Sequence, residues 1–396
     1  MATQSETELQ KAVQTTDTIA TAGKLSPKQA STFVDYVFDL SMLKDNVRTE
    51  RFRNESMEID EVTLGQRVAM AHAEASDPQR RRAVGHQKIS LTPAEITVPI
   101  EISERYLKHN LQGESMEDRI IGMMARQFAN DLEELCIMGD TLGVAATAAD
   151  IFPGMSAGVI RDGYLALQDG WAKRAEAGTI VDAEGANISP TIFSQALQEL
   201  PEKYQRDLDS MRFLLPRKLE HKYVEKVSQR LTNAGDAALA GGVAQSFGVR
   251  RTPVPLWNMT PTVVEHVVLN GTTAVELSNS PFVEVVSVTD TTLADVPVTP
   301  YAETTDYTVD AANGTVTRVA LGSIADGATV KVTYRALPQM LFCNLQNLIL
   351  GVGLDIQILE GREIFKNVHQ YAMHIRIGTQ IQNPEACVKV KNIGQG

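Results

Sequence analysis

Residues 115–139 read SMEDRIIGMMARQFANDLEELCIMG and carry the longest helical pattern of this 396-residue chain. Apolar side chains recur at every fourth position, which places them on one face of a helix. Ser115 suits an N-cap, and Gly139 suits the left-handed exit from a helix. About 24 residues at a rise of ~1.5 Å each predict a rod roughly 36 Å long, on which other elements could be laid. The apolar row consists of Met116, Ile120, Met124, Phe128, Leu132 and Cys136.

An edge strand and a ribbon precede this rod. Residues 96–103 alternate between apolar and polar side chains, which predicts a half-buried strand. Pro99 cannot donate to a strand ladder, so this strand should lie at a sheet edge. Further upstream, residues 63–74 and the stretch that starts near His86 are predicted to be two strand-like arms joined by a polar tip. A two-stranded ribbon has little core of its own, so it needs a surface to lie on, such as a neighbouring subunit.

Six arginines near the ribbon are candidates for intersubunit contacts. Three of them lie in the polar tip, where no aromatic residues are interleaved with them. A tip that grips acidic groups on a neighbour is therefore favoured over a nucleic-acid patch. The other three lie in an extended-looking stretch before the ribbon, where a solvated basic segment and intersubunit salt bridges are both open. The tip residues are Arg80, Arg81 and Arg82, and the earlier ones are Arg48, Arg51 and Arg53.

Composition limits the functions open to the chain. The formal net charge of −12 argues against a protein that coats nucleic acid, although a container whose inner wall avoids its contents is compatible with it. No apolar run approaches ~18 residues and the N-terminus is polar, so neither a membrane span nor a signal peptide is predicted. Cys136, Cys343 and Cys387 are widely spaced, which argues for a reducing compartment during synthesis.

The chain after the rod alternates helix and strand patterns. Ser189 and Pro190 open a helix, residues 213–215 predict a short buried strand, and residues 218–230 predict a charged helix. Such alternation is typical of a mixed α/β domain. The pattern resumes at residue 341 and ends in two closing strands, near residues 375–377 and 388–390, which should pair with strands from much earlier in the chain.

Residues 258–337 differ in composition from the sequence on either side. They are rich in Val and Thr and contain five short strand candidates separated by turns. Asn313 and Gly314 form the strongest short hairpin signal, of the primed turn type. About 80 residues with turns this frequent predict a small β-sandwich of immunoglobulin-like type, inserted into the surrounding domain. The strand candidates are residues 263–269, 283–288, 307–310, 315–319 and 330–334.

No constellation of residues in the sequence points to catalysis or metal binding. There is no Gly-x-Ser-x-Gly elbow, and His369 and His374 have no Cys or carboxylate set that would complete a zinc site. Glu133 and Glu134 lie off the apolar row of the rod, which favours a solvated or intersubunit face over acid–base chemistry. Cys136 lies on the row and is predicted to be core. The sequence therefore predicts neither an enzyme nor a cofactor.

Taken together, these parts resemble the major capsid protein of tailed phages, which has the Hong Kong 97-like fold. The order of parts is similar: an arm, an extended two-stranded loop, the strand running into ISERYL, and a long spine helix that ends at Met138-Gly139-Asp140. PEACVKVKNI, residues 384–393, looks like the last returning strand of that family. Residues 305–335 are similar to small β-domains that recur in phage virion proteins. The resemblance covers most of residues 26–396, and it is carried by the order and spacing of the parts.

The resemblance implies an α+β fold with seven consecutive segments. The axial domain would be formed by two of them and would be interrupted by the inserted β-sandwich. The segments are residues 1–57 (N-terminal arm), 58–103 (extended loop), 104–185 (peripheral domain with the spine helix), 186–257 (axial domain, first part), 258–337 (inserted β-sandwich), 338–378 (axial domain, second part) and 379–396 (return strand of the peripheral domain).

The implied function is that of a shell subunit. It would self-assemble into hexamers and pentamers of an icosahedral head that encloses double-stranded DNA without sequence-specific contacts. Residues 1–25 are too short for the cleaved scaffolding segment of some members, so a separate scaffolding protein or none is expected. A portal and a decoration protein are further expected partners. The protein would be assembled in the host cytoplasm and would reside in the virion.

Three further inferences from the resemblance stay open. One member of the family links its subunits covalently through a lysine of the extended loop and an asparagine of the peripheral domain, for which Lys88 and Asn383 or Asn392 are the candidates. An encapsulin-like bacterial compartment that loads a cargo enzyme would keep the fold and change the function. Residues 258–337 could also bind a host surface.

Overall fold

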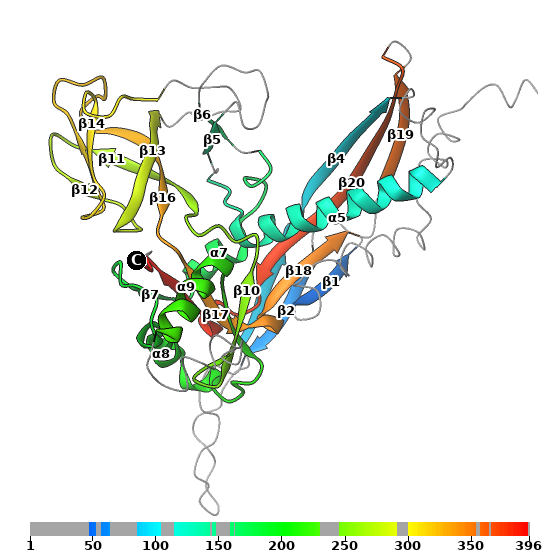
Figure 1. Ribbon diagram of the computed structural model, residues 1–396, viewed down its shortest axis with the longest axis horizontal. Coiled ribbons are helices and arrows are strands. Elements are labelled where there is room, and N and C mark those ends of the chain that lie inside the picture. The colour runs from blue at the N-terminus through cyan, green and yellow to red at the C-terminus, as the bar shows by residue number, and fades with distance from the viewer. Residues whose placement is uncertain are drawn as a thin grey trace, which may run out of the picture.

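The computed structural model describes most of the chain from residue 47 onwards. The described residues are 47–52, 57–63, 85–103, 115–142, 145–147, 159–161, 163–229, 245–290, 300–353, 357–363 and 366–394. They contain a long sheet with helix α5 beside it, a six-stranded sheet flanked by helices, and a separate pair of three-stranded sheets (Figure 1). The fold is therefore a mixed arrangement of helices and sheets.

Helix α5 spans Ser115–Met138, as its apolar row predicts. Phe128, Leu132 and Cys136 of that row are at most 2% exposed, and they share a core cluster with residues of the long sheet. The predicted left-handed exit is wrong, because Gly139 is not among the residues with positive φ. Glycine is needed there for a different reason: a Cβ at Gly139 would lie 2.3 Å from the carbonyl oxygen of Gln168.

The long sheet is organised around β20. The first half of this strand pairs with β4 on one side and with β19 on the other. Its second half pairs with β18, which in turn pairs in parallel with β1. Among the described strands β4 has no other partner, so Pro99 lies in an edge strand as predicted. The strands are β1 (Arg48–Phe52), β4 (Ala94–Ser103), β18 (Leu348–Gly353), β19 (Gln357–Glu363) and β20 (Val368–Ile381).

The ribbon is an antiparallel pair of β2 (Met57–Thr63) and β3 (Gly85–Leu91), with Thr63 opposite Gly85. The first arm therefore begins six residues earlier than the predicted 63–74. Acidic residues interrupt the apolar alternation of β2 in the sequence, which hid the strand. Residues 64–84, with the arginines of the tip, lie outside the described residues.

The six-stranded sheet has the order β7-β21-β17-β8-β10-β9. Helices α8 (Pro190–Glu199) and α9 (Arg217–Ser228) cover one face. The ring of Phe213 lies there 4.9 Å from that of Phe193 and 4.5 Å from that of Phe342. The other face adjoins α5 and α7 (Trp171–Arg174). The strands are β7 (Thr179–Asp182), β8 (Met211–Pro216), β9 (Gln245–Ser246), β10 (Val249–Val254), β17 (Met340–Asn344) and β21 (Cys387–Lys391).

The sheets divide the C-terminal part of the chain differently from the predicted domains. Residues 338–378, assigned to the axial domain, supply β18 and β19 to the long sheet as well as β17 to the six-stranded sheet. Residues 379–396, assigned to the peripheral domain, supply β21 to the six-stranded sheet. The reason lies in the alternation of β21, whose Val388 and Val390 join the aromatic core beside Phe342.

Residues 262–336 form two three-stranded antiparallel sheets around a core of their own. The chain enters this unit from β10 and returns to β17, the two strands that flank β8 in the six-stranded sheet. All five strand candidates are present, and β12 is an additional short strand. The strands are β11 (Thr262–Leu269), β12 (Val275–Glu276), β13 (Phe282–Asp290), β14 (Tyr307–Asp310), β15 (Thr315–Arg318) and β16 (Ala328–Ala336).

The turn at Asn313 is not of the predicted primed type. The last pair of the hairpin is Asp310 and Thr315, so the loop has four residues, and of Asn313 and Gly314 only Gly314 has a positive φ, of 63°. The carboxylate of Asp310 holds the loop by accepting from the backbone N–H of Asn313 at 3.1 Å and from its side-chain amide at 2.7 Å. This local capping replaces the tight two-residue turn.

The remaining elements are short. They are β5 (Ala145–Thr147), β6 (Val159–Arg161) and the 3-10 turns η1 (Ala175–Ala177), η2 (Glu202–Tyr204), η3 (Leu345–Asn347) and η4 (Pro384–Ala386). Within the described ranges, no helix has the length and apolar character that crossing a membrane requires.

Candidate functional site

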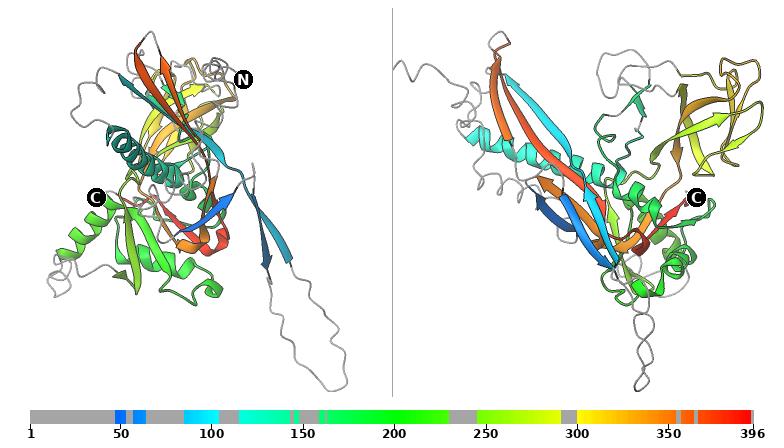
Figure 2. Two further views of the ribbon diagram at one scale, coloured as in Figure 1. Left: turned by 90° about the vertical axis from the view of Figure 1, so that its right-hand side faces the viewer. Right: turned by 180° about the vertical axis from the view of Figure 1, so that it is seen from behind.

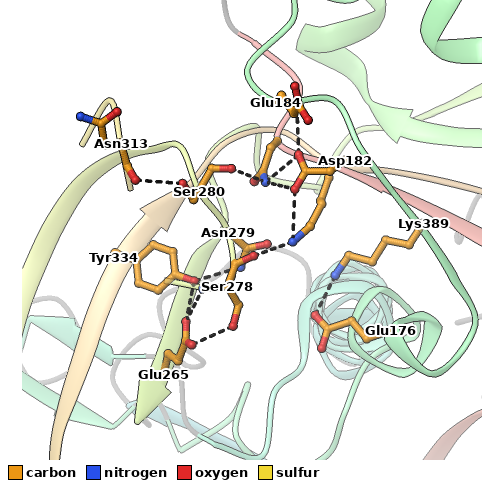
Figure 3. A network of polar contacts seen from close by, with 12 residues as sticks. Glu176, Asp182, Glu184, Glu265, Ser278, Asn279, Ser280, Asn313, Tyr334 and Lys389 are labelled. Atoms are coloured by element: carbon orange, nitrogen blue, oxygen red, sulfur yellow. Dashed lines mark hydrogen bonds and ion pairs between the residues drawn. The ribbon is translucent and has the colours of Figure 1, made fainter. Parts of the chain in front are cut away.

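Polar side chains gather where the six-stranded sheet meets the unit of residues 262–336 (Figure 3). The residues that follow β21 run between a turn at residues 182–187 and a loop at residues 278–281 of that unit. We call this region the junction. In the part of the chain that the structure describes, no group of three or more His, Cys, Asp or Glu side chains could hold a metal ion.

Asn392 is the central residue of the junction. Its side chain is fully buried, and its backbone has a positive φ of 58°, a conformation that asparagine tolerates better than most residues. Its amide donates to both carboxylate oxygens of Asp182, at 3.0 and 2.9 Å, and to the carbonyl oxygen of Ser280 at 2.8 Å. One amide therefore joins the six-stranded sheet to the loop of the neighbouring unit.

A second set of bonds surrounds the same loop. Lys391 donates to the carbonyl oxygen of Ser278 at 2.5 Å and lies 3.4 Å from Asp182. Glu265 of β11 accepts from the hydroxyl of Ser278 at 2.7 Å and from that of Tyr334 at 3.1 Å. Burial, and then the Glu265 carboxylate, raise the pKa of Tyr334, so its hydroxyl stays protonated and donates.

A row of alternating charges continues from the junction towards α5. Lys389 is 4% exposed and contacts Glu176 at 2.9 Å; Glu176 contacts Lys173 at 3.2 Å, and Lys173 lies 3.9 Å from Asp140. Burial lowers the pKa of Lys389 and raises that of Asp140. Burial also raises the pKa of Glu176, but Lys389 and Lys173 outweigh it and leave that pKa lowered. Each buried charge thus has an opposite charge beside it, as low-dielectric surroundings require.

A groove of about 540 Å³ lies between the six-stranded sheet and the unit of residues 262–336. Its lining includes Lys389 and Lys391 on one side and Val263 and Glu265 on the other. Ile180, at 43% exposure, also lines it. The six-stranded sheet and the unit of residues 262–336 therefore touch through the junction and leave an open groove beside it.

The foot of the ribbon is anchored differently. Leu91, the last residue of β3, is 1% exposed and lies against Gly351 of β18 and Gly378 of β20, which face each other in the long sheet. A Cβ at Gly351 would lie 2.2 Å from the Cδ2 atom of Leu91. The side chain of Gln380 also donates to the carbonyl oxygen of Ser90, at 3.0 Å. One leucine seated on two glycines therefore fixes where the ribbon leaves the body.

Two of the six arginines predicted to contact neighbouring subunits lie in the described residues. Arg48 lies in β1, contacts Glu50 at 2.7 Å and donates to Gln382 at 3.0 Å, and Arg51 is an exposed residue of the same strand. Arg53 and the three tip arginines, Arg80, Arg81 and Arg82, lie outside the described residues. The intersubunit role of all six stays a prediction.

The candidate crosslink residues are engaged in other contacts. Lys88 is exposed and contacts Glu58 within the ribbon at 2.7 Å. Asn383 accepts from the backbone of Glu385 at 3.0 Å and donates to the hydroxyl of Tyr204 at 2.6 Å, whereas Asn392 holds the junction. The crosslink stays a prediction, and a denaturing gel of assembled particles with bands of monomer size alone would end it.

Sequence reasoning missed most of the junction. Asp182 is the last residue of β7 and Ser280 lies in a polar loop, and only the fold brings them to Asn392. Glu133 was predicted to be solvated or at an interface but is 6% exposed. It lies beside Cys136, and burial together with the Glu133 carboxylate raises the pKa of that thiol. Cys136 is a core residue, as predicted.

No family model matches the chain. Its sequence is 29% identical over 243 residues to the putative prophage capsid protein YqbE of Bacillus subtilis (strain 168). The aligned region covers 61% of this chain and 72% of that protein.

The fold is similar to that of a chain in the structure of the satellite phage P4 procapsid including size determination (Sid) protein. The TM-score is 0.56 at 10% sequence identity, over 100% of this chain and 99% of that chain. A chain from Microbacterium phage Oxtober96 is similar over 89% of this chain and 90% of its own length, with a TM-score of 0.47 and 10% identity.

Proposed function

We infer that this chain is the major capsid protein of a phage head and that it acts by self-assembly into a closed shell around double-stranded DNA. The observation that carries this inference is the match of the whole chain to a procapsid chain over nearly its full length. The similarity in sequence to a prophage capsid protein supports it independently. The protein then resides in the virion, and its role is structural rather than catalytic.

The finer architecture is part of the proposal. We assign the spine helix to α5 and the extended loop to the β2–β3 ribbon of a Hong Kong 97-like fold. The sheet order supports a revised division, in which the six-stranded sheet with α8 and α9 is the axial domain and the long sheet with α5 is the peripheral domain. The two sheets of residues 262–336 are proposed to be an immunoglobulin-like insertion that projects outward.

The proposed mechanism is mutual coverage of subunits. The ribbon leaves the body at its foot and has no sheet beside it beyond that point in the described residues (Figure 2). An isolated hairpin is marginal in water, so a neighbouring subunit must supply the second surface. Each subunit would make several such contacts at once in hexamers and pentamers, and closure of the shell multiplies their effect. A separate scaffolding protein, a portal and a decoration protein are further proposed partners.

Electron microscopy of the protein expressed alone tests this function directly. The expected result is regular shells or capsomers, whereas a protein that stays monomeric at high concentration would contradict it. A matched variant replaces residues 64–84 by a short Asn-Gly turn between Thr63 and Gly85, which keeps the paired strands and edge strand β4. This variant should stay soluble and fail to form shells. Shells that hold a protein cargo and exclude DNA would instead favour a bacterial compartment.

A further inference from the structure

The outer face of α9 carries a row of cations. The helix buries Leu219, Tyr223 and Val227 against the six-stranded sheet, which turns its basic residues outward. Three of these basic residues follow one another at intervals of four, so they stand above one another on one side of the helix. The cationic residues are Arg217, Lys218, Lys222 and Lys226, of which only Lys222 is partly buried. We call them the α9 row.

The acidic residues of α9 leave most of the positive charge of the α9 row unneutralised. Glu220 lies 3.8 Å from the buried guanidinium of Arg251, whose Cζ atom lies over the ring of Tyr223, 4.7 Å from its centroid. Glu225 is then the one exposed acid of the helix. Among the described residues, no side chain forms an ion pair with the four cations of the row. Like charges four residues apart destabilise a helix, so this arrangement lowers the stability of the isolated subunit.

The rest of the molecule is acidic. The chain has a net charge of −12, and residues 258–337 alone contain nine acidic and three basic residues. A cationic row on such a protein creates a local field that attracts polyanions, while the remaining surface repels them. The α9 row is therefore a local site at which the field of this acidic chain favours a polyanion.

The chemistry of the row favours one kind of polyanion. Apart from the cations, the outward face holds His221, the acid Glu225 and the partly buried Val224, but no exposed Phe, Tyr, Trp or large aliphatic residue. A protein partner needs such anchors, and single-stranded nucleic acid needs aromatic rings for its bases to stack on. Lys218 to Lys226 span about 12 Å of helix, a length along which a DNA duplex presents about seven phosphates. A row of lysines without anchors fits the backbone of a duplex.

The position of the α9 row in the fold agrees with a DNA duplex as its ligand. Side chains of β21 alternate, so Val388 and Val390 face α9 whereas Lys389 and Lys391 face the groove and the unit of residues 262–336. The α9 row and this unit thus lie on opposite sides of the six-stranded sheet. If the unit projects outward from the shell, α9 faces the contents.

We propose that the α9 row binds the phosphate backbone of double-stranded DNA without sequence preference and tethers the packaged duplex to the shell wall. The proposal rests on the proposed function as a DNA-enclosing shell. It predicts a weak, strongly salt-dependent contact, repeated once in every subunit. Such a contact lets the contents pack against an otherwise repulsive wall.

Fluorescence anisotropy of a short labelled duplex, titrated with unassembled full-length subunits between about 50 and 200 mM salt, tests the proposal. Each phosphate contact contributes about −0.9 to the slope of log affinity against log salt. The triple variant Lys218→Gln, Lys222→Gln, Lys226→Gln should lower the magnitude of the slope by about 2.7 and weaken binding at least ~10-fold at the lowest salt. The triple Lys→Arg variant at the same positions should keep the affinity and the slope.

A control variant changes the net charge equally at other sites. Lys203→Gln, Arg335→Gln and Lys366→Gln remove three exposed cations that already face acids, and they should leave DNA binding within twofold of the original. The proposal is overturned if the control triple weakens DNA binding as much as the Lys→Gln triple of the α9 row. It is also overturned if the original chain binds no duplex, or if polyglutamate binds to it more tightly than DNA. Microscopy of each variant separates this outcome from the proposed function, since shells that form without binding DNA leave the function intact.

Discussion

The ribbon and the unit of residues 262–336 both project from the same body, but they are held by opposite physical means. The unit has a core of its own, which includes the fully buried Tyr334 and Val332, and its loop meets the body through the polar junction. The ribbon has two strands, and its foot is held by Leu91 on a pair of glycines. The unit can keep its shape without neighbours, whereas the ribbon depends on them.

The largest expected difference concerns the two segments in isolation. Residues 258–337 expressed alone should fold and unfold cooperatively on heating, because about 80 residues with two packed sheets can bury enough apolar surface. A peptide of residues 57–91 should show no cooperative transition under the same conditions. Circular dichroism during a thermal scan measures both. The comparison fails if the isolated unit is unfolded or if the ribbon peptide melts cooperatively.

Substitution of Gly351 should break the foot of the ribbon. Valine at this position would overlap Leu91 and crowd Phe52, whose Cε1 atom would lie 3.1 Å from the new Cβ. Such overpacking should lower the free energy of unfolding by about 3 kcal/mol and abolish shells. Gly361→Ala in β19, where a Cβ meets nothing within 4 Å, is the matched control and should change neither. Denaturant titration and electron microscopy provide the readouts, and intact shells from Gly351→Val would refute the anchoring role of Leu91.

Loss of the Asn392 side chain should loosen the unit and leave the ribbon unaffected. Asn392→Gly keeps the positive φ and removes the amide that joins Asp182 to Ser280, which should cost about 1.5 kcal/mol. Hydrogen exchange should then rise in residues 278–281 and stay unchanged in residues 85–91. Asn367→Gly, at an exposed position with a φ of 53°, is the control for the backbone effect. Unchanged exchange in residues 278–281 would show that the junction does not hold the unit.

Acid should lower the free energy of unfolding through the charge row beside the junction, by less than the two substitutions above. The pKa of Glu176 is lowered from its usual value of 4.5, so its contribution to stability is present above that value and is lost as the pH falls through the folded pKa. Asp140 has a raised pKa, so it contributes with the opposite sign and reduces the net effect. Glu176→Gln leaves the buried Lys389 without its opposite charge but keeps a hydrogen-bond acceptor beside it, and it should cost about 1 kcal/mol at pH 7. The difference in melting temperature between this variant and the original should shrink below pH 4.5; a constant difference would rule out the carboxylate as its source.

Local patterns in the sequence carried a large part of the fold. Helix α5 and the five strands of the unit were predicted because each depends on a periodicity within a short window, which burial on one face imposes. The edge position of β4 followed from one proline. The ribbon was predicted, but the start of its first arm at Met57 was not, because acidic residues mask the alternation of β2.

The sequence by itself determined the helices and strands whose apolar side chains are regularly spaced, since backbone geometry and this spacing act between near neighbours. The tertiary structure alone decided which segments meet. Lys389 reads as a surface residue of a closing strand, and it is buried because Glu176, 213 positions away, supplies the opposite charge. Gly351 and Gly378 are paired only in the folded sheet, where together they make the seat for Leu91. Contacts between distant segments depend on the register of whole strands, which no short window of sequence contains.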